Sequence, residues 1–187
     1  MQTSRGKLFI LSGPSGVGKS TVLKAVLERL PTLYFSISAT TRPPRPGEIN
    51  GVHYHFITEA EFADMQANDQ LLEWARYVDN AYGTPAAPIE AQLNKGLHAL
   101  LDIEVQGALQ VKTKMPEAVA IFLAPPSMET LEQRLRGRKT DAEDKIQSRL
   151  ATARLEFAQK GAYDHIVVND TVAQAAAEIV ALIGGAE

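Results

Sequence analysis

The chain has 187 residues, of which 45% are hydrophobic and 22% are charged, and its formal net charge is −3. This composition is typical of one folded domain and excludes disordered, collagen-like and coiled-coil chains. The absence of cysteine excludes disulfides, thiolate metal sites and a cysteine nucleophile, and it fits a reducing compartment. The slightly acidic balance argues against a general nucleic-acid-binding protein. No apolar run has the length of a membrane span, so we expect a cytoplasmic protein without nucleic acid or membrane as partners.

The chain begins with an apolar run that predicts a buried strand over residues 7–11. A helix is expected next, because Val22, Val26 and Leu30 fall on one stripe of the segment 19–30. Later apolar runs predict strands over 97–103, 119–123 and 165–168, and a last helix over 171–183. Strands that alternate with helices in this way predict an α/β fold, a parallel sheet of the P-loop NTPase type with helices on both faces.

Residues 36–86 interrupt this alternation. They open with a loop rich in proline and arginine and continue with strand-like pieces around 52–57 and 71–78. A short helix between the two pieces starts at Thr58, where Glu61 completes a capping box. This stretch predicts a small mixed α+β insert outside the parallel core.

Residues 128–160 form a second interruption, which is helical in pattern and rich in charge. A charged helical pair with little apolar surface suits a mobile lid, whereas a solvated helical hairpin is the simpler alternative. We therefore expect three parts: a core of residues 1–35, 87–127 and 161–187, an insert of 36–86 and a lid of 128–160.

The strongest signal is Gly13-Pro14-Ser15-Gly16-Val17-Gly18-Lys19-Ser20, which matches G-x-x-x-x-G-K-[ST] between a predicted strand and a predicted helix. Glycines allow successive backbone N–H groups to turn toward phosphate oxygens, and the helix N-terminus adds partial positive charge. Lys19 is expected to reach the β- and γ-phosphates, and the Ser20 hydroxyl to ligate Mg²⁺. This pattern predicts a nucleoside triphosphate site.

The phosphate-binding loop does not by itself name the reaction. A GTPase would carry Asn-Lys-x-Asp to read guanine, but Val168-Asn169-Asp170 lacks the lysine. A large ATPase motor would need a longer core. A short chain with an insert and a charged lid favours a kinase of small molecules.

The insert offers residues for a phosphorylated acceptor. Arg42 and Arg45 lie three apart in a loop stiffened by proline, and guanidinium forks suit a dianionic phosphate. Tyr54 and Tyr82 can each donate a phenolic hydroxyl. Glu73 could accept the two parallel N–H bonds that a guanine edge offers. Two small polar residues could complete the recognition of a base, namely Ser38 and Thr84.

Seven stretches occur together in one order, and together they resemble the guanylate kinase family from Gly6 to the last helix. They are Gly13 to Thr21, Ser36 to Glu48, Asn50 to Phe56, Glu73-Trp74-Ala75, Tyr82-Gly83-Thr84, Asp102 to Gly107 and Val168-Asn169-Asp170. The resemblance implies transfer of the ATP γ-phosphoryl group to GMP, giving ADP and GDP, with dGMP as a further acceptor. It also implies Mg²⁺ with ATP and leaves the oligomeric state undetermined.

The resemblance also implies a role for each matching residue. The ATP-binding residues would be Gly13, Pro14, Ser15, Gly16, Val17, Gly18, Lys19, Ser20, Thr21 and Asn169. The GMP-binding residues would be Ser38, Arg42, Arg45, Tyr54, Glu73, Tyr82, Thr84 and Asp102, the last close to the base or to the waters of the metal. The catalytic residues would be Lys19, Arg42, Arg134, Arg138 and Arg149, the last three on the lid.

Two other function classes remain as alternatives. Another P-loop kinase, for example one that phosphorylates a ribose bisphosphate, would share the loop and the lid but not the insert residues. A non-catalytic guanylate-kinase-like module of scaffold proteins would bind peptides. Such modules typically lose residues of the phosphate-binding loop, whereas Lys19 and Ser20 are present in this chain.

Overall fold

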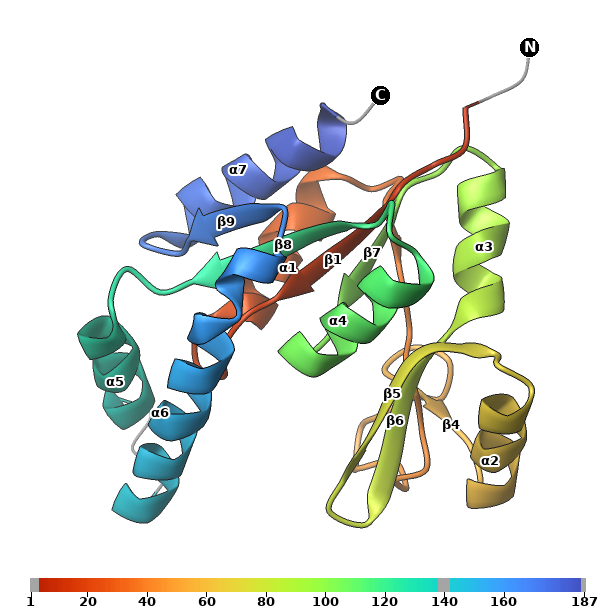
Figure 1. The fold of residues 1–187 in the computed structure, drawn as a ribbon, viewed down its shortest axis with the longest axis horizontal. Helices are drawn as coiled ribbons and strands as arrows, with labels where there is room; N and C mark the ends of the chain where they lie inside the picture. Colours follow the sequence, from red (N-terminus) through yellow and green to blue (C-terminus); the bar gives the residue numbers. More distant parts are fainter. Residues whose placement is uncertain (1–3, 138–141, 186–187) are drawn as a thin grey trace.

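A five-stranded parallel sheet forms the centre of the molecule in the computed structural model, which describes residues 4–137 and 142–185 (Figure 1). The strands follow one another in the order β2-β7-β1-β8-β9, and every neighbouring pair is parallel. Their bounds are β1 Leu8–Ser12, β2 Tyr34–Phe35, β7 Ala99–Asp102, β8 Val119–Ala124 and β9 His165–Val168. This arrangement confirms the predicted fold class.

Helices cover both faces of the sheet. Side chains alternate along β1, so Phe9 and Leu11 pack with α1 (Lys19–Arg29) and α7 (Val172–Gly184) on one face. Leu8 and Ile10 pack on the other face, against α3 (Ala86–Asn94) and α4 (Val105–Lys114). Burial on both faces explains why β1 is an uninterrupted apolar run rather than an alternating one. In the part of the chain that the structure describes, no helix is both long enough and apolar enough to cross a membrane.

The insert forms a second sheet, of order β4-β3-β6-β5, in which only β3 and β4 are parallel. Its elements are β3 Ala39–Thr40, β4 His55–Phe56, α2 Glu59–Ala67, β5 Leu71–Tyr77 and β6 Asn80–Pro85. The predicted capping box is confirmed, because Thr58 and Glu61 exchange hydrogen bonds at the start of α2. Phe62 and Leu71 anchor a small core that belongs to the insert alone.

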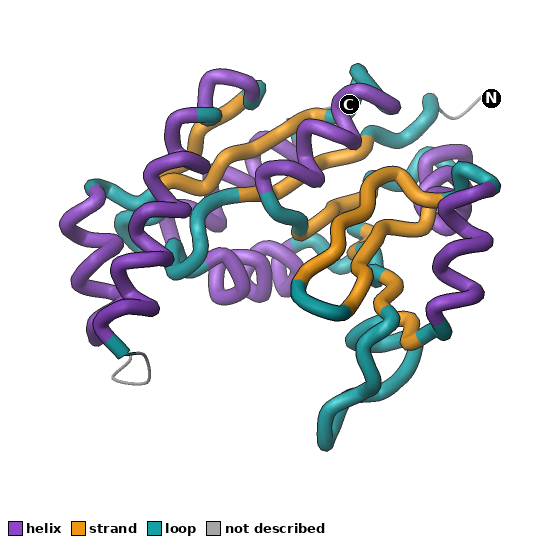
Figure 2. The backbone as a smooth tube through the Cα atoms, turned by 60° about the horizontal axis from the view of Figure 1, so that its bottom comes forward, coloured by secondary structure: helices purple, strands orange, loops and turns teal. Residues whose placement is uncertain are grey.

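The expected strand around 52–57 is largely a turn. Only His55–Phe56 forms a strand, and the long loop between β3 and β4 extends away from the rest of the insert (Figure 2). Two side-chain acceptors hold this loop: Asn50 Oδ1 accepts the N–H of Phe56, and His53 Nδ1 accepts the N–H of Ile49. These local bonds compete with strand pairing, which is why the apolar pattern alone overestimated the strand.

The charged stretch forms two helices, α5 (Met128–Gly137) and α6 (Glu143–Ala158), followed by the short 3₁₀ helix η1 (Lys160–Ala162). Their facing sides are apolar and form a core of their own, made of Leu131, Leu135, Ile146, Leu150 and Ala153. The pair therefore has more apolar contact than its charge suggested. Figure 1 shows the helical pair and the insert projecting from the same end of the core, on opposite sides of it.

Candidate active site

The loop between β1 and α1 forms a cavity of about 300 Å³. Gly16 and Gly18 have φ values of +91° and +98°, in the left-handed region that favours glycine. A Cβ on Gly18 would lie 2.7 Å from Asn169 Nδ2. Any other residue at this position would therefore be disfavoured both by the backbone conformation and by the lack of space. The cavity is lined by Gly13, Pro14, Ser15, Gly16, Gly18, Lys19, Ser20, Thr21, Glu104 and Glu156. Backbone groups and a helix N-terminus thus surround a space that suits a polyphosphate.

The side chains of Asn169 and Arg134 support this loop by binding the carbonyl of Val17. The Val17 side chain is buried in the core, while its carbonyl accepts hydrogen bonds from Asn169 Nδ2 at 2.7 Å and from Arg134 Nη1 at 3.3 Å. Arg134 Nη2 also donates to the carbonyl of Asn169 at 2.9 Å. The structure therefore joins α5 and the end of β9 to the loop, with Asn169 only 3% exposed.

Lys19 connects this cavity to a second one, because it lines both. Its Nζ lies 2.9 Å from Asp102 Oδ1 and donates to the carbonyl of Ile103 at 3.2 Å. The contact follows from the topology: β1 and β7 are parallel neighbours in which Leu11 pairs with Asp102, so both strands end at the same edge.

The second cavity, of about 340 Å³, lies between the core and the insert. It is lined by Lys19, Ser38, Tyr54, Glu73, Ala75, Tyr77, Tyr82, Gly83, Asp102, Ile103, Glu104, Gln106 and Gly107. Glu73 is 8% exposed and accepts a hydrogen bond from Thr84 Oγ1 at 2.6 Å, across the β5–β6 pair. Burial raises the pKa of Glu73, against the lowering effect of the Thr84 bond. A Cβ on Gly107 would lie 2.7 Å from Glu73 Oε2, so the small residue makes room for this carboxylate.

Arg42 lies beside this second cavity and has a carboxylate partner in its own loop. Its Nη1 and Nη2 donate to Glu48 Oε2 and Oε1 at 2.9 and 3.0 Å. Its guanidinium carbon lies 5.5 Å from the ring centre of Tyr54 and 5.7 Å from that of Phe56. The Arg42 hydrogen bond is the main reason why the pKa of Glu48 falls to about 2.

Comparison with known proteins places this geometry in a family. The family model for guanylate kinase matches residues 5–185. The guanylate kinase of Gloeobacter violaceus is 54% identical over 177 residues, which cover 95% of this chain and 86% of that protein. The chain belongs to the guanylate kinase family. The family resemblance seen in the seven stretches is thereby confirmed.

Two further guanylate kinases agree over almost the whole chain. That of Synechocystis sp. is 50% identical over 187 residues, covering 100% of this chain and 98% of that protein. The crystal structure of guanylate kinase from Anaplasma phagocytophilum matches with a TM-score of 0.77 at 34% identity, covering 99% of this chain and 88% of that one. The fold predicted from the sequence is therefore shared with a solved guanylate kinase structure.

The two cavities bring together most of the residues expected for a guanylate kinase. The expected residues that line them are Gly13, Pro14, Ser15, Gly16, Gly18, Lys19, Ser20, Thr21, Ser38, Tyr54, Glu73, Tyr82 and Asp102. Those that do not line either cavity are Val17, Arg42, Arg45, Thr84, Arg134, Arg149 and Asn169. Arg138 lies outside the described residues. The roles of all these residues in the guanylate kinase reaction stay predictions.

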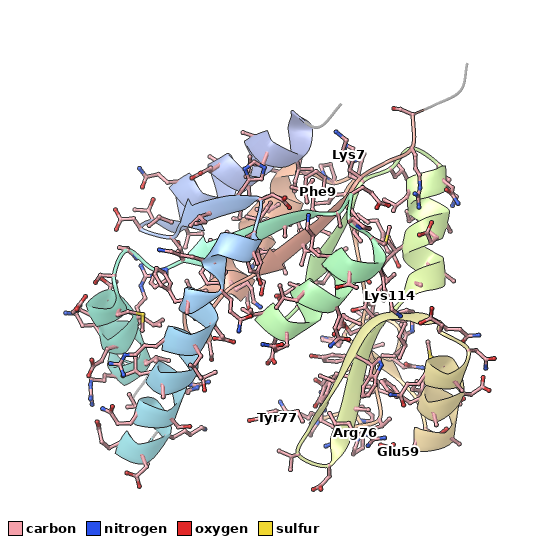
Figure 3. All side chains as sticks on the ribbon, viewed as in Figure 1. Lys7, Phe9, Glu59, Arg76, Tyr77 and Lys114 are labelled. Carbon is pink, nitrogen blue, oxygen red and sulfur yellow. The ribbon has the colours of Figure 1, made fainter. Side chains whose placement is uncertain are left out.

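Sequence reasoning missed several lining residues of this guanylate kinase. Glu156 lines the first cavity from α6, and its burial together with neighbouring Glu104 raises its pKa. No local pattern marks Glu156, because its place depends on how α6 packs. Ala75 and Tyr77 line the second cavity. They alternate with Glu73 along β5, and this spacing predicts that all three face the same side of the strand. In Figure 3, Tyr77 points from β5 toward the side on which α6 lies.

Proposed function

We propose that this chain transfers the γ-phosphoryl group of ATP to GMP, giving ADP and GDP, as its family membership indicates. One observation carries the proposal: a backbone cradle and a cavity with a buried carboxylate meet at a single lysine, Lys19. A kinase needs this arrangement, since the acceptor oxygen must lie in line with the γ-phosphorus.

The cradle binds the phosphates of ATP. Backbone N–H groups of Gly16, Gly18, Lys19 and Ser20 donate to phosphate oxygens, and the start of α1 adds partial positive charge. Lys19 offsets the negative charge of the β- and γ-phosphates, for which its Nζ must leave the carboxylate of Asp102. Asn169, a residue of the sequence-predicted ATP site, supports the cradle through the Val17 carbonyl.

The second cavity binds GMP. Guanine presents two parallel N–H donors at its N1 and N2 edge, and the Glu73 carboxylate accepts both. Thr84 orients Glu73, because its hydroxyl holds Oε1. The remaining members of the proposed GMP site are Ser38 and Asp102 near the base and Arg42, Arg45, Tyr54 and Tyr82 at the phosphate. No strong base is required, since the attacking phosphate oxygen is already ionised.

Mg²⁺ fits the cradle, although its role here rests on family membership and on donor chemistry. The Ser20 hydroxyl and the carboxylate of Glu104 are oxygen donors of the kind that Mg²⁺ prefers. Among the described residues, the buried Oε2 of Glu156 in the same cavity has no hydrogen-bond partner. We propose that Ser20 ligates the ion and that the two carboxylates hold its waters. When bound, Mg²⁺ neutralises charge on the β- and γ-phosphate oxygens.

We further propose that the three parts move relative to one another during the reaction. The insert of residues 36–86 would carry GMP, and residues 128–160 would close over ATP as a lid that excludes water. Arg134, Arg138 and Arg149 would bring positive charge to the transferring group. Arg134 already contacts the cradle through the Val17 carbonyl, so it also links α5 to the ATP site. Acceptance of dGMP and a cytoplasmic location remain predictions.

The experiment that tests this function is ADP formation from Mg-ATP with GMP, dGMP, AMP, UMP, dTMP and ribose bisphosphate offered separately. We expect turnover with GMP, with dGMP as a second acceptor, and far less with the others. Preferred turnover of another acceptor would keep a P-loop kinase but contradict the role of Glu73. A folded sample that binds ATP and turns over no acceptor would favour the non-catalytic alternative.

A further inference from the structure

The guanidinium of Arg42 has five N–H donors, and Glu48 and Pro43 take three of them. Nη1 uses both of its donors, one to Glu48 Oε2 at 2.9 Å and one to the Pro43 carbonyl at 2.8 Å. Nη2 uses one donor, to Glu48 Oε1 at 3.0 Å. The donors left are the Nε–H and the second Nη2–H, which lie side by side on one edge of the planar group.

This remaining edge has the geometry that a phosphate requires. Two parallel N–H donors form the fork that binds two oxygens of a phosphate or carboxylate at once. Glu48 binds the end of the guanidinium, between Nη1 and Nη2, and does not occupy the side edge. A phosphate can therefore bind Arg42 without displacing Glu48. Tyr82, which lines the acceptor cavity, hydrogen-bonds this guanidinium as well and, after Glu48, contributes to the raised pKa of Arg42, so the phosphate would meet Arg42 and Tyr82 together.

Glu48 is itself fixed in the loop. Its Oε2 accepts the backbone N–H of Arg45 at 2.6 Å, so one carboxylate ties together the two arginines of the loop. The Arg42–Glu48 pair is partly buried, with 12% and 18% of the side chains exposed. On the other side, the rings of Tyr54 and Phe56 limit the positions that the guanidinium can take.

We propose that Glu48 is a positioning residue for the acceptor phosphate, because it holds Arg42 with its Nε–Nη2 edge free and the Arg45 backbone in place. The proposal rests on the function proposed above and adds to it a residue that does not touch substrate. The pairing also affects charge, because Glu48 neutralises Arg42. Recognition of the phosphate by Arg42 then depends on the two parallel N–H donors rather than on net positive charge.

The test is the variant Glu48→Gln, which keeps the shape of the side chain but removes its charge and places an amide against the guanidinium. We expect KM for GMP to rise about 10- to 100-fold, the range for a lost hydrogen-bonded charge. The Kd for ATP measured without GMP should stay unchanged, because Glu48 does not line the cradle. An unchanged KM for GMP in a folded Glu48→Gln protein would overturn the proposal.

A double-mutant cycle separates positioning from a merely structural role. If Glu48 acts through Arg42, Glu48→Gln in the Arg42→Ala background adds no further increase in KM for GMP. Equal effects of Glu48→Gln in both backgrounds would overturn the proposal. Should Glu48→Gln fail to fold, the variant Arg42→Lys decides instead. It keeps the positive charge but loses the two parallel N–H donors, so a KM for GMP equal to that of the wild type would contradict phosphate recognition by this edge of Arg42.

The matched control is Arg76→Gln, on the same insert. Arg76 pairs with Glu59 at the surface (Figure 3). It lies on β5 between Ala75 and Tyr77, which line the acceptor cavity. Because neighbouring strand residues point to opposite faces, this variant should leave KM for GMP unchanged. Wild-type protein without GMP turnover would refute the proposed function, whereas normal wild-type turnover with an unaffected Glu48→Gln variant would refute only the role of Glu48.

Discussion

The proposed ATP cradle and the proposed GMP cavity are built in different ways. The cradle takes most of its lining from consecutive residues, Gly13 to Thr21, and uses backbone groups held in place by glycine. The GMP cavity draws side chains from separated segments, including Ser38, Tyr54, Glu73 and Asp102. On the proposed function, the backbone of the cradle determines where phosphate binds, whereas the side chains of the cavity determine which acceptor binds. Variants of the two regions should therefore fail differently.

The largest effect is expected for Lys19→Ala. Lys19 is the one cation among the described residues that line both cavities, so kcat should fall by about 10²- to 10³-fold, as for loss of one preorganised donor. Stability should change little, since Lys19 is not part of the apolar core. The control is Lys24→Ala, an exposed lysine on the same helix, measured with steady-state kinetics and thermal unfolding. Loss of kcat that parallels loss of folding would contradict the assigned role.

Glu73→Gln should affect only the acceptor side. Replacing the carboxylate removes a charged acceptor of two hydrogen bonds, so KM for GMP should rise roughly 10- to 100-fold. The Kd for ATP should not move, because Glu73 does not line the cradle. Steady-state kinetics measures the KM for GMP, and isothermal titration measures the Kd for ATP. A matching loss of ATP affinity would show that the two regions are not separable in this way.

Gly18→Ala should affect the cradle through the backbone. Its φ of +98° costs an L-residue about 1–2 kcal/mol, and the new Cβ would also meet Asn169 Nδ2 at 2.7 Å. Gly51→Ala is the matched control, since Gly51 also has positive φ but has open space around it. We expect both variants to lose stability in urea unfolding and only Gly18→Ala to lose ATP affinity. Equal ATP affinity in the two variants would contradict the claim that the close contact between Gly18 and Asn169 matters for ATP binding.

The smallest effect concerns pH. Burial raises the pKa of Glu73, so a fall in pH protonates it earlier than an ordinary glutamate, whose pKa is 4.5. The value of kcat/KM for GMP should therefore decline on the acid side above pH 4.5, and Glu73→Gln should abolish this decline. The same shift makes the folded protein less stable as pH rises through the pKa of Glu73, because ionisation is easier in the unfolded chain.

Glu48 provides the opposite case within one insert. Its pKa is lowered to about 2, so its contribution to stability is present above pH 4.5 and is lost only as pH falls from 4.5 toward 2. The acid decline in GMP turnover should thus follow Glu73 and not Glu48. A decline that persists in Glu73→Gln would assign it to another group.

The sequence predicted the cradle almost completely because its residues are contiguous and their spacing reflects one local geometry. Val17 shows the limit: it belongs to the motif, yet its side chain lies in the core and only its carbonyl serves the loop. The parallel sheet was also predictable, since strands buried on both faces are short apolar runs.

The acceptor cavity could be predicted as a set of residues but not as a geometry. The Glu73–Thr84 bond depends on the β5–β6 register, which contains a shift between Leu71 and Glu73. The role of Glu48 depends on how the loop folds back on Arg42. In the helical pair α5 and α6, the many charged residues concealed the apolar spacing of residues such as Leu131 and Leu135, which form the core of the pair.

The central claim is that the two regions form one catalytic site that meets at Lys19 and Asp102. Lys19 pairs with Asp102 in this structure, and each partner is expected to turn to a different substrate. Calorimetric titration of GMP with and without a non-hydrolysable ATP analogue, in wild type and in Asp102→Asn, tests this most directly. We predict that the analogue tightens GMP binding by about fivefold or more in wild type and does not in the variant. An equal ratio of the two GMP dissociation constants in both proteins would contradict the claim.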